Sequence, residues 1–335
     1  MLKKILVNTG ITLVLPVAIY LIFVILTRVV PGAIPYGSWD LLLATLQNSA
    51  MAVLVALALC VNMPTGRIDM SAGSVVVLTA IVCGNLALEY HWNIIIMLIA
   101  SIILAMILTS ITGAVHVFLR LPAIIVSLGM VIIYEAITGI VFDGQGVLAL
   151  GRDIRLLGYI PYCFIVVIAA LIVFHIVTEH TKFAYHSKLL AGGQAMAVRI
   201  GVREKLNVIQ SFALSGVFLG AAATIYISNY GAIEAATNMS SASVMFDSLL
   251  PVVIGLVLAR FSCRAIGVAV SVISMKMISY GLFCLGYNAS VQNVVSGIFI
   301  LAIVVITGYM AGQPERNRIK QRAQSLREII EQNGV

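Results

Sequence analysis

Charged residues are scarce in this sequence. They make up 10% of its 335 residues, and hydrophobic residues make up 61%. Soluble globular chains carry about 25% charged residues and roughly 45–50% apolar ones. This composition excludes a soluble domain and indicates an integral membrane protein.

Motifs of catalytic, nucleotide-binding and pore-forming proteins are also absent. The sequence has no GxxxxGK[ST], GxSxG, HExxH or TVGYG, and no cluster of histidines with carboxylates. We therefore expect no enzyme, no ATP hydrolysis by this chain and no potassium filter. Its five cysteines are scattered without a CxxC pair, which argues against a zinc site or a disulfide framework. No metal and no cofactor are predicted.

Long apolar segments are abundant. Each is near twenty residues long and can cross a hydrocarbon core of about 30 Å as a helix. The sequence thus predicts an all-α, polytopic membrane protein with about ten transmembrane helices. The predicted spans are 5–27, 41–63, 70–88, 93–118, 122–142, 159–178, 207–230, 247–259, 265–286 and 291–311. The eighth span is short, and we expect it to be broken or tilted.

Lysine and arginine are unevenly divided between the two predicted sides of the membrane. If the N-terminus is cytoplasmic, only Arg28, Arg152 and Arg155 of the 20 basic residues lie outside, and Lys276 falls within a span. Because cytoplasmic loops carry an excess of basic residues, both termini are predicted to be cytoplasmic. The net charge of +7 therefore needs no nucleic-acid partner.

One cytoplasmic connection, residues 181–207, contains a short helix-like piece bracketed by Gly193 and Gly201. A helix of about seven residues is too short to be stable alone in water, so we expect it to dock. It could pack on the ends of its own helices, or its apolar Met196 and Ile200 could enter a groove on a soluble partner.

A basic tail, residues 313–335, follows the predicted transmembrane domain of residues 1–312. Its apolar residues recur at helical spacing beneath a basic face, at Ile319, Ala323, Leu326 and Ile330. We expect such a helix to lie on anionic lipid or on a protein partner, and a frayed end is the alternative.

Four charged residues fall inside or at the edges of predicted spans: Asp69, Glu135, Asp247 and Lys276. A central Asp, Lys or Arg costs roughly +2.5 to +3.5 kcal/mol on insertion scales, so such residues are functional candidates. Glu135 and Lys276 could pair with each other, but the sequence alone leaves their partners open.

The stretch "TGRIDMSAGS", residues 65–74, is polar for its position between two apolar runs. Pro64 and Gly66 are expected to interrupt the helical backbone, and Gly73 permits close approach of another segment. Asp69 could accept hydrogen bonds from free N–H groups where the next helix begins, or it could contact a passing solute. Elsewhere, "SGVFLG", residues 215–220, is a GxxxG pattern that predicts close helix packing.

Four separated segments resemble, in the same order, motifs of one family. "TGRIDMSAGS" is similar to GIDLSVGS, and "LPAIIVSLGMVIIYEAITGIVFDGQGV" is similar to PAFIVTLGTMxIYRG. "LLAGGQAMAVRIGV" resembles AIGGNxxAARLSGI, and "FDSLLPVVIG" resembles LDAIAAVVIGG. From about residue 40 to 310, the chain thus resembles the sugar-type inner-membrane permeases of ATP-binding-cassette importers, such as those for ribose, xylose, galactose and autoinducer-2.

The resemblance implies a permease of about ten spans in the bacterial cytoplasmic (inner) membrane. Its implied partners are a second permease subunit, two cytoplasmic ATPase subunits that bind the ATP, and an extracytoplasmic solute-binding protein. Closure of the ATPases would move a coupling segment, and this would switch the permease between outward-open and inward-open states. The residues that match this coupling segment or lie within it are Gly192, Gly193, Gln194, Met196, Ala197, Arg199, Ile200 and Gly201.

The sequence also departs from the family pattern. Arg67 stands where glycine is common, and Glu135 stands where arginine is usual. Ser279 and Tyr280 replace two asparagines. A glycine-rich segment is reduced to "GLVLARFSCRAIG", which keeps Gly255 and Gly267. These departures leave the solute open, and they allow the chain to be one half of a heterodimer.

Three functions are consistent with these observations. The first is the permease subunit of an ATP-driven importer for a monosaccharide or a similar small polar solute. The second is the same architecture serving nucleosides or branched-chain amino acids, and the third is a proton-coupled secondary transporter using Glu135 or Lys276. The candidate groups along the solute path are Asp69, Ser71, Ser127, Ser279 and Tyr280.

Overall fold

The computed structural model describes residues 2–259 and 262–288, and a few residues beyond them: 290–292, 294, 295, 297, 298, 301, 302 and 305. Most of the predicted tenth span, 291–311, and the whole of the predicted tail, 313–335, lie outside the described residues.

The regular secondary structure of the described part is helical, apart from an isolated bridge between Val147 and Ile233. Its α-helices are α1 (Leu2–Val29), α2 (Trp39–Asn62), α3 (Ala72–Glu89), α4 (Ile94–Leu119), α5 (Ala123–Ile140), α6 (Tyr162–His180), α7 (Lys182–Gly192), α8 (Gln194–Arg199), α9 (Glu204–Tyr230), α10 (Ala242–Leu258) and α11 (Arg264–Cys284). Three short 3₁₀ helices, η1 (Met63–Thr65), η2 (Val141–Gly144) and η3 (Arg152–Gly158), lie in connections.

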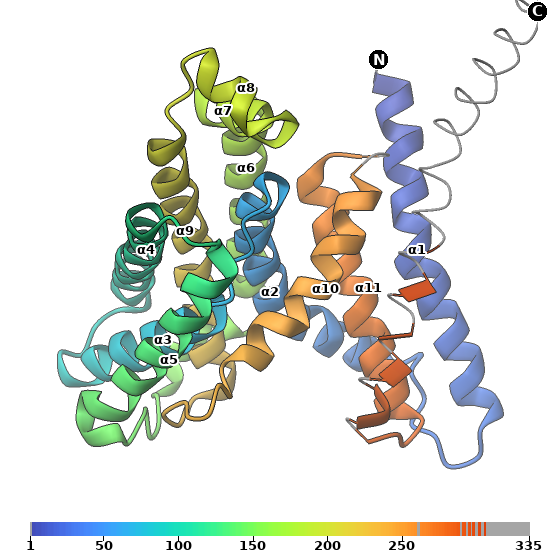
Figure 1. Cartoon of the computed structure of the whole chain (residues 1–335). Coiled ribbons are helices and arrows are strands. Elements are labelled where there is room, and N and C mark those ends of the chain that lie inside the picture. Colours follow the sequence, from blue (N-terminus) through green and yellow to red (C-terminus); the bar gives the residue numbers. More distant parts are fainter. Residues whose placement is uncertain are drawn as a thin grey trace, which may run out of the picture.

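Eight helices of the described part are long and apolar enough to cross a membrane. They are α1 to α6, α9 and α11, and they coincide with the first seven predicted spans and the ninth. The all-α, polytopic class is therefore confirmed. Figure 1 places α7, α8 and the start of α1 at the same end of the molecule, which agrees with the prediction that both lie on the cytoplasmic side.

The predicted eighth span differs from expectation at its start. We expected residues 247–259, but α10 begins five residues earlier, at Ala242, and has 17 residues with Pro251 inside. It remains shorter than the eight long helices. The residues added at its start, 242–246, include the apolar Val244, Met245 and Phe246, and Asp247 separates them from the apolar run that marked the predicted span.

The centre of the fold is α9, which packs against α4, α2 and α3. The predicted GxxxG contact is confirmed. A Cβ atom on Gly216 would lie 2.6 Å from Met106 Cα, and one on Gly220 would lie 2.5 Å from Ile102 Cα. Both contacts are with backbone atoms of α4, so α4 and α9 approach each other as closely as small residues allow.

A second glycine contact joins α10 to α11. A Cβ on Gly255 would lie 2.6 Å from Val268 Cα, and one on Gly267 would lie 2.7 Å from the carbonyl oxygen of Gly255. These are the two glycines that the chain keeps from the reduced glycine-rich segment. Beside this pair of helices, α1 lies along α11 at the edge of the molecule (Figure 1).

The backbone between α2 and α3 is broken, as predicted. After η1, Gly66 takes a left-handed conformation with φ +76°, and helix resumes only at Ala72. The first turn of α3 lies against the start of α10, because a Cβ on Gly73 would overlap the carbonyl oxygen of Ser241. Two helix starts therefore meet inside the protein.

We expect Gly220→Ala to destabilise the chain. The added methyl group would overlap the α4 backbone, and overpacking of this kind costs typically about 1–3 kcal/mol. Thermal unfolding of purified protein in detergent should show a lower midpoint for Gly220→Ala than for Gly129→Ala, a helical glycine with open space at its Cβ. Equal midpoints would contradict the close α4–α9 contact.

Candidate functional site

The predicted coupling residues form one compact feature at the end of the molecule that carries α7 and α8. Gly192 ends α7, Gly193 separates it from α8, and Gly201 follows α8 with φ +95°. The helix α8 has six residues and, as expected for its length, is docked: Ala197 is 1% exposed and packs with Leu190 and Val202.

The outward side of this segment is apolar. Met196 is 69% exposed, Val198 is 47% exposed and Ile200 is 62% exposed. Ala197 is thus the one buried residue of α8, and three large apolar side chains stay uncovered. The expected packing on adjacent helix ends is confirmed, and the entry of the exposed apolar side chains into a partner's groove stays a prediction.

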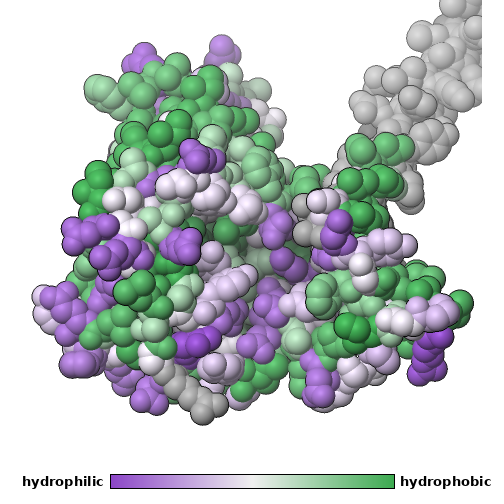
Figure 2. Space-filling view, turned by 90° about the horizontal axis from the view of Figure 1, so that it is seen from below, coloured by the Kyte–Doolittle hydropathy of each residue, from purple (hydrophilic) through white to green (hydrophobic). Residues whose placement is uncertain are grey.

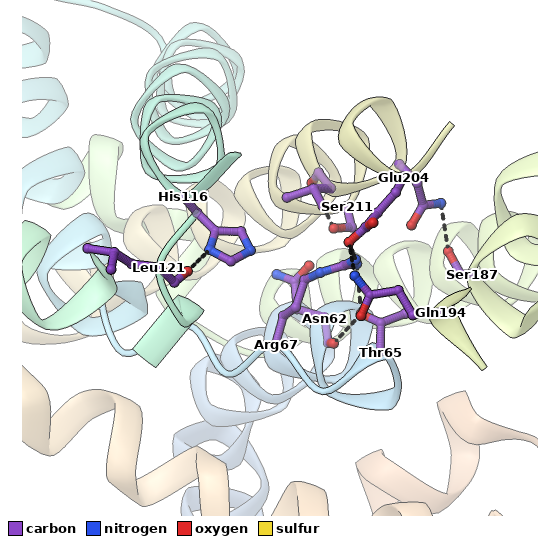
Figure 3. A network of polar contacts seen from close by, with 11 residues as sticks. Asn62, Thr65, Arg67, His116, Leu121, Ser187, Gln194, Glu204 and Ser211 are labelled. Carbon is purple, nitrogen blue, oxygen red and sulfur yellow. Dashed lines mark hydrogen bonds and ion pairs between the residues drawn. The ribbon is translucent and has the colours of Figure 1, made fainter. Parts of the chain in front are cut away.

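Polar contacts tie this segment to the rest of the fold (Figure 3). Glu204, the first residue of α9, accepts a hydrogen bond from Gln194 Nε2 of α8 and pairs with Arg67 Nη2 at 3.3 Å. Arg67 also donates to Thr65 Oγ1 at 3.1 Å. Burial lowers the pKa of the Arg67 guanidinium, and the charge of Glu204 opposes that shift.

A second ionic link starts from α7. Glu179, near the end of α6, accepts from Lys188 Nζ at 2.5 Å and pairs with Arg264 Nε at 3.2 Å. Because Arg264 begins α11, one carboxylate joins α6, α7 and α11. Lys188 and Arg264 line a cavity of about 330 Å³.

Three of the predicted path residues, Asp69, Ser71 and Ser127, lie together in the interior, at 2%, 0% and 0% exposure. Asp69 Oδ1 accepts from the backbone N–H of Ser71 at 2.9 Å and from its hydroxyl at 2.6 Å. Ser127 Oγ, on α5, accepts from Met70 N–H at 3.0 Å. Asp69 thus satisfies a donor just before α3, as its first interpretation predicted.

Glu135 has the same kind of role at the other helix start. On α5, 5% exposed, it accepts from Met239 N–H at 2.7 Å, from Ser241 N–H at 2.9 Å and from Ser241 Oγ at 2.5 Å. Ser241 directly precedes α10, so this carboxylate satisfies donors that the helix cannot pair internally. The possible pairing of Glu135 with Lys276 is therefore wrong.

Lys276 pairs instead with Asp247, Nζ to Oδ2 at 3.3 Å, across α11 and α10. The remaining predicted path residues, Ser279 and Tyr280, lie beside this pair. With Ser243, they line a cavity of about 590 Å³ between the two helices. Ligand sites commonly measure about 300–1,000 Å³.

A second cavity, of about 280 Å³, shares Asp247, Lys276 and Tyr280 with the first and continues toward α2 and α9. Its further walls include Asn48, Tyr226 and Tyr230. The Asp247–Lys276 pair thus borders two adjacent spaces lined by carboxylate, ammonium, amide and phenol groups. Figure 2 shows hydrophilic residues bordering a recess on the face opposite α7 and α8.

Comparison with known proteins agrees with this architecture. Residues 41–304 match the family described as "Branched-chain amino acid transport system / permease component". The chain belongs to this family. The chain is 25% identical over 313 residues to the autoinducer 2 import system permease protein LsrC of Shigella flexneri, covering 90% of each chain. It is 27% identical over 292 residues to the galactose/methyl galactoside import permease protein MglC of Escherichia coli, covering 78% of this chain and 84% of that one.

This chain is a multi-pass membrane protein, and its relatives are transport subunits. Sequence reasoning found α8, the broken stretch and four residues of the cavity, Asp247 and Lys276 as charged candidates and Ser279 and Tyr280 as path candidates. It missed Asn48, Tyr226 and Tyr230 as lining residues and the Arg67–Glu204 pair. A usable signal existed for Asp247 and Lys276, since two opposite charges in neighbouring spans favour pairing.

We expect Glu135→Ala to lower the free energy of unfolding by about 1–3 kcal/mol, since it leaves buried N–H and hydroxyl donors unsatisfied. Thermal unfolding in detergent measures the loss. Glu234→Ala, at an exposed position, is the control and should unfold as wild type does. If both variants matched wild type, Glu135 would not hold the start of α10.

Proposed function

We propose that this chain is the permease subunit of an ATP-driven importer in a bacterial cytoplasmic membrane. Its solute would be a monosaccharide or a similar small polar molecule, moved without chemical change. The observation that carries the proposal is the uncovered apolar side of α8, on a six-residue helix joined by polar contacts to the spans. The names of the relatives, import permeases for autoinducer 2 and for galactose and methyl galactoside, support it.

The partner at α8 would be an ATPase subunit. Met196, Val198 and Ile200 offer an apolar contact of the kind that enters a groove on a soluble protein. Arg199 and Gln194 add polar groups at its rim. Nucleotide-driven movement of that groove would displace α8, and the Gln194–Glu204 and Lys188–Glu179 contacts would carry the displacement to the spans.

A second permease subunit would cover α10 and α11. The side chain of Asp247 is 64% exposed, although α10 is an apolar helix among membrane spans. A charge facing lipid is costly, so such residues face a bundle interior or a water-filled space. We infer that the cavity beside Asp247 is one wall of the solute path, and that a second copy or a related subunit supplies the opposite wall.

The chemistry of this wall suits a sugar. Hydroxyl groups of a dehydrated sugar need both acceptors and donors, and Asp247, Lys276, Asn48 and Tyr280 supply them. Ser279 adds a hydroxyl in the larger cavity. We assign Asp69, Ser71 and Ser127 to support of the path, because Asp69 Oδ1, the Ser71 hydroxyl and the Ser127 hydroxyl bond within the protein. An extracytoplasmic solute-binding protein would deliver the solute.

The family description also names branched-chain amino acids, and opposite charges at Asp247 and Lys276 would suit a zwitterion. The relatives named above favour a sugar-like solute instead. Calorimetry with the solute-binding protein of the same operon separates these candidates. Binding of a sugar supports the proposal, and binding of an amino acid or nucleoside overturns the solute assignment. A proton carrier is not favoured, since Glu135 holds the start of α10 and Lys276 pairs with Asp247.

We expect uptake by proteoliposomes that hold the assembled complex to require ATP and to persist without a proton gradient. The double variant Met196→Glu, Ile200→Glu should lose uptake and fail to copurify with the ATPase, because charges would enter an apolar contact. Met196→Leu with Ile200→Leu keeps that contact apolar and should retain both. Uptake driven by a proton gradient alone would overturn the proposal.

Lys276→Met should reduce ATP-driven uptake about tenfold or more, since it removes a charged group from the solute path while keeping a long side chain. Copurification with the ATPase should be unchanged, because α8 is untouched. The matched control is Lys205→Met, which removes an exposed cytoplasmic charge. Wild-type uptake by Lys276→Met would exclude the cavity between α10 and α11 as the path.

A further inference from the structure

Side chains from α8, from the start of α9 and from the α2–α3 connection, 137 residues before Glu204, meet at one carboxylate oxygen, Glu204 Oε1. It accepts a hydrogen bond from Gln194 of α8, and it pairs with Arg67 of the α2–α3 connection at 3.3 Å. Figure 3 shows the three side chains converging from α8, α9 and the connection. We call this set, Arg67, Gln194 and Glu204, the cytoplasmic clasp.

The two charged side chains of the clasp are partly shielded from solvent, so each stabilises the charge of the other. The Arg67 side chain is 9% exposed and that of Glu204 is 30% exposed. Removing one partner of a buried pair leaves an uncompensated charge, which is far more disruptive than losing a surface ion pair. Arg67 is also held by Thr65 Oγ1 at 3.1 Å, so its direction is fixed by its own connection.

Short hydrogen-bonded steps lead from the clasp into the membrane. Two residues after Arg67, Asp69 bonds to Ser71 at the start of α3. Between them, Met70 N–H donates to Ser127 on α5 at 3.0 Å. The connection between Gly66 and Ser71 is not helical, and these hydrogen bonds link it to α3 and α5. A displacement of α8 at Gln194 therefore has a continuous polar route to α3 and α5.

We infer that Arg67 and Glu204 are positioning residues for coupling: they transmit movement of α8 to the α2–α3 connection and, through it, to α3 and α5. This inference rests on the proposed function, because it assigns the part that converts ATPase movement into a change of the spans. It concerns residues outside α8, and Arg67 stands at a position where the family pattern commonly has glycine.

The test compares wild type with Arg67→Gln, Glu204→Gln and the double variant. Lys205→Gln, one residue beyond Glu204, is the control for loss of a nearby exposed charge. Proteoliposomes containing the ATPase and the solute-binding protein report solute moved per ATP hydrolysed. Thermal unfolding reports stability, and brief trypsin treatment of each purified chain reports access to Arg199 at the end of α8.

Each single variant should move at least about tenfold less solute per ATP, because a hydrogen-bonded charge is lost, and should be cut faster at Arg199. The double variant leaves no unpaired buried charge, so it should regain the thermal midpoint of wild type but not its coupling. A double variant with normal stability but low coupling would show that the clasp transmits movement and does not only stabilise the fold.

Recovery of both stability and coupling in the double variant would overturn the inference, since the clasp would then only stabilise the fold. Wild-type coupling in Arg67→Gln would overturn it as well. If the wild-type complex itself showed no ATP-driven uptake, the proposed function would fail, and the inference with it. That last result appears in the wild type alone, so the two failures are distinguishable.

Discussion

A helix that begins inside the membrane has free N–H donors that lipid cannot satisfy, and this constraint organises the centre of the protein. Two such starts, those of α3 and α10, meet where Gly73 lies against Ser241. Asp69 satisfies donors at the first and Glu135 at the second. The sequence analysis treated Asp69 and Glu135 as candidates for transport. In the structure, both carboxylates stabilise the backbone where a helix begins.

This junction lies between the two features that a transporter must connect. On one side, the α2–α3 connection leads through Arg67 and Glu204 to α8. On the other, α10 runs from the junction to Asp247, which pairs with Lys276 beside the cavities. Because α3 and α10 touch at glycine distance, a shift of one start must displace the other. The geometry is thus suited to carry movement from α8 to the proposed solute path.

The sequence predicted the features that depend on local composition. Long apolar runs located eight spans, Pro64 and Gly66 located the break, and Gly216 with Gly220 located the α4–α9 contact. Pairings across long sequence distances were not predictable from one sequence, because many partners satisfy the same charge. Glu135 could have met Lys276, yet the fold brings it to Ser241, 106 residues away. The start of α10 was also missed, because Asp247 separates residues 242–246 from the apolar run that follows.

Arg67 and Glu135 both stand where the chain departs from the family pattern, and both are now buried and bound. An arginine at position 135 could only donate hydrogen bonds, so it could not accept those of Met239 and Ser241. A glycine at position 67 could not reach Glu204, which would leave Gln194 as the partner of that oxygen. Arg67 thus adds a charge-assisted link between the α2–α3 connection and α9, and Glu135 adds hydrogen bonds between α5 and the start of α10.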